Sequence, residues 1–281
     1  MAFPLPADSM TIHLQVFGST SSGNCTTVWN ERGAVMVDCG LGVRYTTRCL
    51  DAVGLDWSQI DGVLLTHTHR DHANTYTLQC MLRHGVKLMG HVDTLSSFLR
   101  EHPVAAALDR AGLLVPFNGA SLVVGPFEVA SFAVPHDAPG GSHGYALRHE
   151  QAGNGATVAV ATDLGQADGE LALHFRDADA IVLESNHDVG MLRASRRPPW
   201  LQKRIRGAHL SNDESASFLA EAIGISRKAP GAIALAHISR ECNTNALAHQ
   251  CTAGRLAELG ADECEIVATH KSRPSKIITV G

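Results

Sequence analysis

Short apolar runs alternate with longer amphipathic stretches along most of the 281-residue chain. Runs rich in valine and isoleucine predict buried strands at 12–17, 25–29, 34–38, 62–66, 86–89, 126–134, 143–149, 156–162, 178–183, 231–236 and 264–268. Apolar residues at helical spacing predict helices at 44–53, 73–83, 93–101, 168–175, 199–206, 213–223 and 244–258. Strands that alternate with helices in this way predict an α/β protein.

Two short segments carry signals for where these elements begin and end. Asn212 precedes the acids Asp213 and Glu214, a pattern that is typical of a helix N-cap. We therefore expect His209 to lie just ahead of this helix. Residues 151–155 contain Asn-Gly between two apolar runs, which predicts a hairpin whose strands lie side by side.

The densest cluster of metal-binding side chains follows the apolar run at 63–65. Residues 66–72 read Thr-His-Thr-His-Arg-Asp-His, so the imidazoles of His67, His69 and His72 accompany the carboxylate of Asp71. Neutral imidazole suits zinc and similar metals, and HxH followed by DH can serve two neighbouring ions. Solvated loop histidines are the alternative. The spacing favours a metal site with two ions.

Isolated acids and histidines close five other apolar runs of the sequence. Any one of them alone is better explained as a polar residue that caps a strand. Five in succession indicate a shared site, because ligands of α/β sheets gather at the carboxyl ends of the strands. These residues are Asp38, His136, Asp163, Glu184 and His237.

Length and composition agree with one domain of residues 1–281. The hydrophobic content of 44% is typical of a globular protein, and we find no apolar stretch of the length that spans a bilayer. Residues 1–8 lack the basic and apolar segments of an export signal. Seven cysteines without a CxxC pair are typical of thiols in a reducing compartment. We therefore expect a cytoplasmic protein without membrane contact.

The net charge of −5 does not indicate a nucleic-acid binder, but one local stretch does. Six basic residues and no acid lie between Leu192 and His209, among them Arg196, Arg197 and Arg204. A solvated helix face explains such a stretch as well as phosphate contact does. Its place directly before His209 favours phosphate contact, because it puts the arginines at the rim of the expected site.

Taken together, these motifs resemble the metallo-β-lactamase fold hydrolases and, within them, the YycJ/WalJ branch of exonuclease-like proteins. The HxHxDH loop is a mark of the whole superfamily. The branch is indicated by Ser-Gly-Asn at 22–24, Asn-His-Asp at 186–188 and His-Leu-Ser-Asn at 209–212. The resemblance spans almost the whole chain, and it implies an α/β fold of the four-layer αββα sandwich type.

The resemblance, to ribonuclease Z and its relatives in particular, also implies a ligand set for two divalent ions, zinc or manganese with iron as an alternative. One ion would be held by His67, His69 and His136. The other would be held by Asp71, His72 and His237, with Asp163 bridging the two. A hydroxide shared by the ions would then attack phosphorus. As a metal ligand at this centre, Asp71 is also expected to be a catalytic residue.

Further residues receive roles around that centre. His209 is expected at the scissile phosphate or the leaving oxygen, with Glu184 orienting its ring, and Asp38 is expected to fix a ligand histidine. A phosphate-binding loop is one interpretation of the turn at 21–24, and a purely structural turn is the other. The expected substrate contacts are Ser21, Ser22, Asn24, Arg196, Arg197, Arg204 and Asn243.

The leading hypothesis is a dinuclear phosphodiesterase that acts on nucleic acid, as a 5′-to-3′ exonuclease on DNA rather than RNA. A cyclic-nucleotide phosphodiesterase is the second hypothesis, because the PhnP-like relatives share these ligands. A metal-binding regulatory protein without turnover is the third. The pair of His209 and Glu184 counts against it, since it forms intact general-acid machinery. Protein partners are left open.

Overall fold

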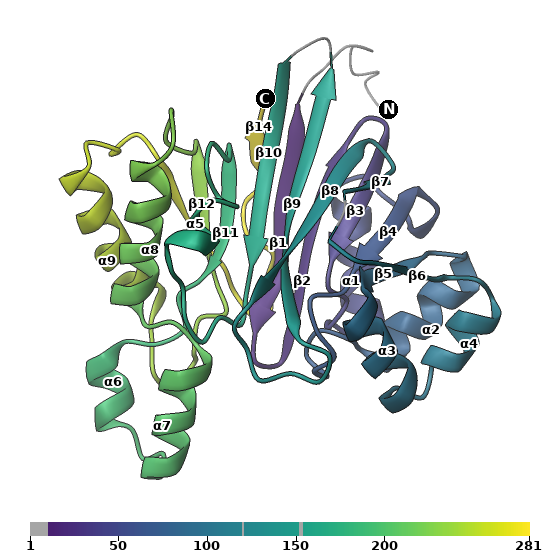
Figure 1. Cartoon of the computed structure of the whole chain (residues 1–281), viewed down its shortest axis with the longest axis horizontal. Coiled ribbons are helices and arrows are strands. Elements are labelled where there is room, and N and C mark those ends of the chain that lie inside the picture. The colour runs from purple at the N-terminus through teal and green to yellow at the C-terminus, as the bar shows by residue number, and fades with distance from the viewer. Residues whose placement is uncertain (1–10, 120, 152–153) are drawn as a thin grey trace.

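The computed structural model describes residues 11–119, 121–151 and 154–281, and Figure 1 shows its course. The strands of the first half are β1 (Ile12–Thr20), β2 (Gly23–Asn30), β3 (Gly33–Val37), β4 (Ile60–Leu64), β5 (Leu88–His91) and β6 (Leu114–Phe117). Its helices are α1 (Val43–Ala52), the short 3₁₀ helix η1 (Trp57–Gln59), α2 (Thr75–His84), α3 (Val92–Glu101) and α4 (Ala105–Arg110).

The second half repeats this mixture of strands and helices. Its strands are β7 (Leu122–Val124), β8 (Phe127–Val134), β9 (Ser142–Gln151), β10 (Asn154–Ala161), β11 (Ala180–Glu184), β12 (Ala232–Ala236), β13 (Glu265–Ala268) and β14 (Ile278–Val280). Its helices are α5 (Gly169–Ala172), α6 (Val189–Ala194), α7 (Pro199–Ala208), α8 (Asn212–Gly224) and α9 (Asn245–Glu258).

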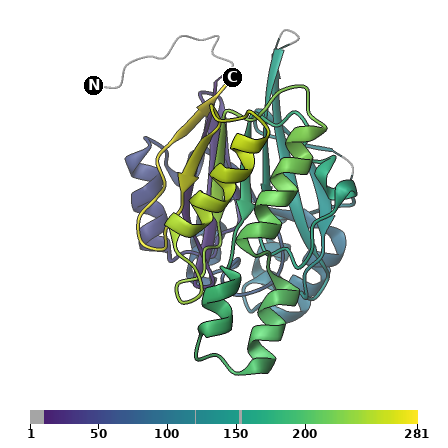
Figure 2. The ribbon, with the colours of Figure 1, turned by 90° about the vertical axis from the view of Figure 1, so that its left-hand side faces the viewer.

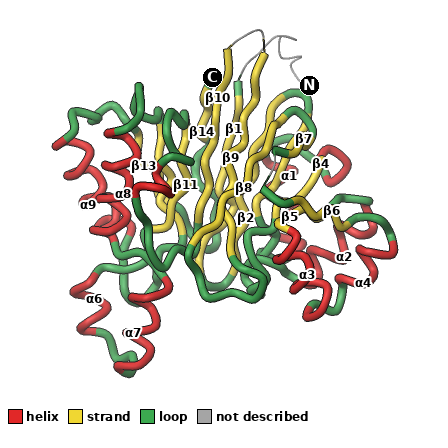
Figure 3. The backbone as a smooth tube through the Cα atoms, viewed as in Figure 1, coloured by secondary structure: helices red, strands yellow, loops and turns green. Residues whose placement is uncertain are grey.

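The described strands form two seven-stranded sheets that lie face to face between two layers of helices (Figure 3). The first sheet has the order β14-β1-β2-β3-β4-β5-β6, and the second β13-β12-β11-β10-β9-β8-β7. Helices α1 to α4 cover the outer face of the first sheet, and α5, α8 and α9 cover that of the second (Figure 1). This arrangement confirms the predicted αββα sandwich.

Alternation of side chains along the strands builds the layers. In β11, Ala180 and Val182 face the core between the two sheets, whereas Ile181 and Leu183 face the helices outside. The same alternation recurs in β3, where Val35 lies between the sheets and Met36 under the helices of the first half. The central strands such as β3, β11 and β12 are therefore buried on both faces, which explains their continuous apolar runs in the sequence.

The strand directions bring the polar strand ends to one edge. β3 and β4 are parallel neighbours, and so are β10, β11 and β12. β8 also runs parallel to β10, because both pair antiparallel with β9. The residues that follow these strands are those predicted to form the site. The helices α6 and α7 project beyond the sheets at this end of the molecule (Figures 1 and 2).

Every predicted strand and helix is present, with boundaries that shift by a few residues. The elements that the patterns missed are the short η1, α4, α6, β6, β7 and β14. One cap was wrong: Ser211 is the N-cap of α8, and its side chain and that of Glu214 form a capping box, so Asn212 is the first helical residue. His209 does lie just ahead of α8.

Some predictions touch residues outside the described ranges. The expected absence of an export signal concerns residues 1–8, which lie outside them. Part of the predicted hairpin turn does too, although β9 and β10 pair antiparallel as predicted, with Gln151 opposite Asn154. That all 281 residues form one domain stays a prediction. All seven cysteines are free thiols, and the cytoplasmic location stays a prediction.

A search of the described residues finds no helix with the length and hydropathy needed to cross a membrane.

The loop after β3 packs tightly on the loop that follows β4. The backbone N–H of Cys39 donates to the carbonyl of His72 at 2.9 Å, and that of Asn24 donates to the carbonyl of Asp71 at 2.7 Å. Gly40 follows Cys39 in this loop, and a Cβ added to Gly40 would meet the backbone oxygen of Asp71 at 1.6 Å. A side chain at residue 40 therefore cannot be accommodated without moving the backbone.

We predict that Gly40→Ala lowers the free energy of unfolding by about 1–3 kcal/mol or more, as overpacking typically does. Gly254→Ala is the matched control, because a Cβ in that exposed part of α9 meets nothing within 4 Å and alanine favours helix. Urea unfolding measures both. Equal stability of the two variants would show that the contact at Gly40 does not constrain the loop.

Candidate metal centre

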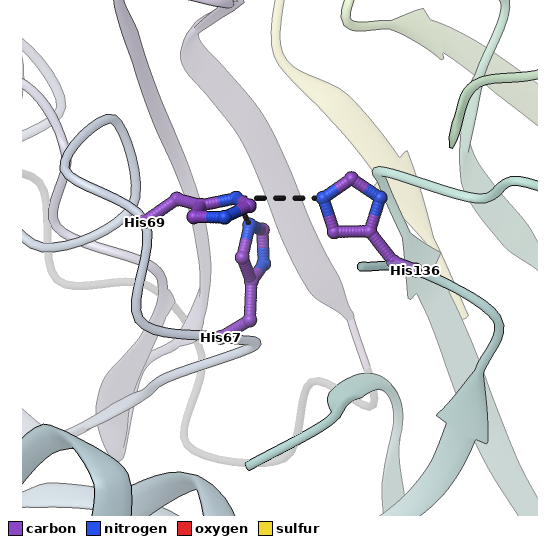
Figure 4. Close-up of side chains that lie close together, drawn as sticks. All are labelled: His67, His69 and His136. Atoms are coloured by element: carbon purple, nitrogen blue, oxygen red, sulfur yellow. Dashed lines mark hydrogen bonds between the residues drawn. The ribbon is translucent and has the colours of Figure 1, made fainter. Parts of the chain in front are cut away.

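Three histidine rings converge at the edge where the two sheets meet (Figure 4). His67 and His69 follow β4, and His136 follows β8. Nδ1 of His69 lies 3.0 Å from Nε2 of His67 and 3.4 Å from Nε2 of His136. Ligand nitrogens around one tetrahedral zinc ion, each about 2.0–2.1 Å from it, are about 3.3 Å apart. The triad thus has the spacing of ligands on one ion.

The electrostatics of this triad favour neutral rings. Burial holds the pKa of His67 well below its usual range and lowers the pKa of His136. Nδ1 of His136 donates to the carbonyl of Ala208 at 3.2 Å, which turns its Nε2 toward the other two rings. Neutral imidazole with a free ring nitrogen is the form that binds a metal.

Asp163 lies at the centre of the site and is 3% exposed. Its Oδ2 is 3.0 Å from Nε2 of His72, and its Oδ1 is 3.4 Å from Nδ1 of His237 and 4.0 Å from Nε2 of His136. Burial alone would raise the pKa of Asp163, but the imidazoles of His237 and His72 outweigh it and hold the pKa well below its usual range. One carboxylate thus touches histidines from both halves of the chain.

A second carboxylate fixes His72 from behind. Oδ2 of Asp38 accepts from Nδ1 of His72 at 2.7 Å, so Nε2 of this ring faces Asp163. Both the backbone N–H and the hydroxyl of Thr66 donate to Asp38, at 2.9 and 3.0 Å. The hydroxyl also lies 3.0 Å from Nδ1 of His67. Thr66 therefore links the two histidines, a role that the sequence analysis missed although the residue opens the motif.

Asp71 and Asn24 complete the surroundings of His72. Asp71 Oδ2 lies 3.7 Å from Nε2 of His72, and the Asn24 amide nitrogen lies 2.9 Å from the same atom. Asn24 was expected to contact substrate, but it is buried at 3% exposure. Its amide oxygen accepts from the hydroxyl of Ser19. Both ends of the Asn24 amide are thus engaged inside the protein, and a contact between Asn24 and substrate stays a prediction.

Glu184 connects His209 with His237. Its Oε1 accepts from Nδ1 of His209 at 2.8 Å and from Nδ1 of His237 at 2.7 Å. Its Oε2 accepts from the backbone N–H groups of Leu164 and Leu210. Burial opposes a charged ring at His237, but Asp163 and Glu184 raise its pKa to about 9. Glu184 was predicted to orient His209 alone, whereas the carboxylate holds both rings.

Backbone strain is concentrated at these strand ends. Asp38, Asp163 and His237 have φ angles of 62°, 59° and 53°, in the left-handed region that most residues avoid. Asp177 is the other non-glycine residue with positive φ in the described part of the chain. Strained backbone of this kind persists where the surroundings determine the conformation, and here it turns each side chain toward the common centre.

The residues present fit a divalent metal. Nε2 of His237 is buried and has no hydrogen-bond partner among the described residues. Three sets of side chains also bring their ligand atoms within 4.8 Å of one another. They are His67 with His69 and His136; His67 with His72 and Asp163; and Asp163 with Glu184, His209 and His237. The last set also contains His209, which the expected ligand set left out.

A cleft of 410 Å³ opens onto this centre. The turn between β1 and β2 lines it through Ser21, and α7 lines it through Leu201, Arg204 and Ile205. His69, Asp71, His136, Asp163, His209 and His237 all reach the cleft. The space is therefore large enough for part of a chain-like substrate rather than for a single small ion.

The other expected substrate contacts differ in their access to the cleft. Ser22 is exposed on the turn, but it is not part of the cleft lining, and neither is Arg196. Arg197 is half-buried, and its guanidinium pairs with Glu241 at 3.1 Å. Asn243 is buried in a network with Asn212 and is absent from the cleft lining. These pairings cross between distant segments, so no local pattern announces them.

Comparisons with known proteins agree with this architecture. Residues 34–231 match the model of a family described as the beta-lactamase superfamily domain. The exodeoxyribonuclease YycJ of Bacillus anthracis is 30% identical over 286 residues, which cover 95% of this chain and 99% of that protein. The exodeoxyribonuclease WalJ of Streptococcus pneumoniae serotype 2 is 26% identical over 245 residues, 86% of this chain and 87% of that one.

A solved structure shows the same fold at lower identity. The metallo-beta-lactamase fold protein YhfI from Bacillus subtilis superimposes with a TM-score of 0.66 and 16% identity. The superposition covers 96% of this chain and 100% of YhfI. The family model matches more than half of the chain. The strand ends that carry the expected metal ligands lie within the matched residues or just after them. The chain therefore belongs to the beta-lactamase superfamily of metal-dependent hydrolases, in the YycJ/WalJ branch that its motifs predicted.

Proposed function

We propose that this protein is a dinuclear phosphodiesterase that removes nucleotides from DNA in the 5′-to-3′ direction. The observation that carries the proposal is the position of Asp163, whose two oxygens lie between histidines of both halves at the base of an open cleft. Two relatives that match most of the chain are named exodeoxyribonucleases, which supports DNA as the substrate.

The chain offers a ligand set for each of two ions. His67, His69 and His136 would hold one, Asp71, His72 and His237 would hold the other, and Asp163 would contact both. Nitrogen and oxygen ligands in this mixture suit zinc or manganese. When bound, the two cations would lower the pKa of a water between them and offset negative charge on a phosphodiester.

His209 is proposed to assist the leaving oxygen. Its ring lines the cleft, and its Nδ1 is engaged by Glu184, which leaves Nε2 as the atom that can meet the substrate. The buried carboxylate behind the ring fixes its orientation. Glu184 thereby acts as a positioning residue, and its second bond to His237 couples that positioning to the metal site.

Two surfaces beside the cleft would hold the strand near the scissile phosphate. Arg204 of α7 and Ser21 of the β1–β2 turn both line the cleft, each from a different element. The basic residues Arg193, Arg196, Lys203 and Arg206 are exposed on the projecting α6–α7 segment (Figure 2). Their charge would attract an anionic backbone toward the site. Arg197 contributes less, because Glu241 neutralises it.

The proposed function is tested with single- and double-stranded DNA and RNA labelled at either end, in the presence of manganese or zinc. We expect a 5′ label to leave at once as a mononucleotide, whereas a 3′ label passes through progressively shorter products. Asp163→Ala controls for a contaminating nuclease. Immediate release of a 3′ label would reverse the polarity, and cleavage of a cyclic nucleotide alone would replace the function by a small-substrate phosphodiesterase.

Asp163→Ala should lower the occupancy of both metal sites, because one carboxylate lies beside ligands of each. The wild-type protein should carry close to two ions per chain in elemental analysis. Asp137→Ala is the matched control, since Asp137 lines the same cleft but belongs to none of the ligand sets. A wild-type protein that binds a single ion under metal-replete conditions would exclude the dinuclear centre.

His209→Ala should reduce the turnover of DNA by roughly 10²–10⁴, the range typical of a lost general acid, while the metal content stays intact. A p-nitrophenyl phosphodiester should recover much of the rate, because its leaving group needs little protonation. Glu184→Gln should show a milder form of the same pattern. If His209→Ala instead releases metal, or slows both substrates equally, His209 is a ligand or a general binding group.

A further inference from the structure

A second groove lies on the other side of the metal loop from α7. It has a volume of 960 Å³, and its lining consists of Gly42, Val43, Arg44, Tyr45, Arg48 and Tyr76. The residues come from the start of α1 and the start of α2. Two arginines, two tyrosines and no acid make up the charged and aromatic part of this lining, and neither the motifs nor the mechanism uses them.

The side chains of this groove are open to a ligand. Arg44 and Arg48 are exposed, and Tyr76 has 68% of its surface exposed. Tyr45 is fixed, because its hydroxyl donates to the carbonyl of Phe17 at 2.9 Å. The arginines that form ion pairs within the described ranges are others, namely Arg148, Arg197, Arg227 and Arg255.

Hydrogen bonds connect the segments of the groove with the loops of the metal site. The hydroxyl of Thr77 in α2 donates to the carbonyl of Leu41 at 2.6 Å, which joins the two helix starts. The loop before α1 is bonded in turn to Asn24 and His72 through Gly40 and Cys39. Tyr76 is five positions after Asp71, so the chain allows at most about 18 Å between their Cα atoms. A strand cleaved at the metals can therefore reach Tyr76.

The chemistry of the lining selects one class of occupant. Guanidinium groups bind phosphates, and exposed aromatic rings stack with bases of any sequence. The Arg48 guanidinium carbon lies 5.9 Å from the centroid of the Tyr45 ring, so charge and aromatic surface occur together. An acidic protein segment would pair with the arginines, but its carboxylates would give the exposed ring of Tyr76 no stacking partner.

We propose that this groove is a second binding site for the single-stranded part of the nucleic-acid substrate, which rests on the function proposed above. Arg44 and Arg48 contact two phosphates, and Tyr76 stacks on a base. The strand then extends from the α7 side of the cleft, across the metals, to the starts of α1 and α2. The groove holds the strand during repeated cleavage and takes no part in the chemistry itself.

The test measures binding of a fluorescein-labelled phosphorothioate oligothymidylate of about 20 nucleotides, long enough to cover both sites. Arg44→Gln/Arg48→Gln should weaken binding and reduce the log–log salt slope by about 1.4, at about 0.7 per phosphate contact on a single strand. Arg32→Gln/Arg83→Gln removes the same charge from two other exposed arginines and should change the slope little. Tyr76→Leu should weaken binding about fivefold or more, whereas Tyr76→Phe should not.

Hydrolysis of bis(p-nitrophenyl) phosphate should be unchanged in all these variants, since that substrate is too small to reach the groove. The proposed groove site is wrong if Arg44→Gln/Arg48→Gln keeps the wild-type salt slope, or if the control pair loses as much slope and affinity. The nuclease function stands in either case. Equal binding by Tyr76→Leu and Tyr76→Phe removes the stacking contact. A wild-type protein that binds and digests no strand overturns both proposals together.

Discussion

The site depends on the interaction of the buried Asp163 carboxylate with the imidazoles around it. Removing an ionised carboxylate from water costs several kcal/mol unless partners compensate for it. Here the compensation comes from imidazoles that approach it from strands of both sheets, His72 at 3.0 Å and His237 at 3.4 Å. The charge of Asp163 therefore depends on the two halves of the chain being assembled, and it is also what makes the centre attractive to cations.

Second carboxylates hold each of these imidazoles in place. Asp38 accepts from Nδ1 of His72, and Glu184 accepts from Nδ1 of His237, at 2.7 Å in both cases. The two arrangements are alike although they come from different halves of the molecule. Each carboxylate engages Nδ1 and leaves Nε2 of the ring to other partners, and such carboxylates orient and tune histidine ligands. The left-handed backbone of Asp38 and His237 is the conformational cost of this arrangement.

The sequence predicted much of this fold and site, for reasons that are local. Strands buried on both faces appear as continuous apolar runs, and the polar residue that ends each run is visible without a structure. The residues that it could not place are those whose partners are remote. Asn24 meets His72 across the first sheet, Arg197 meets Glu241, and Asn243 meets Asn212. The short strands and helices were missed because a few residues show no clear periodicity.

Crystals grown with manganese or zinc allow the most direct measurement, anomalous diffraction at the absorption edge of the metal. We expect two peaks about 3.5–4 Å apart, as in other two-metal hydrolytic sites, with the Asp163 carboxylate contacting both. One peak should lie among His67, His69 and His136, and the other beside His72 and His237. A single peak in the first position, or two peaks of which only one contacts Asp163, would contradict this expectation.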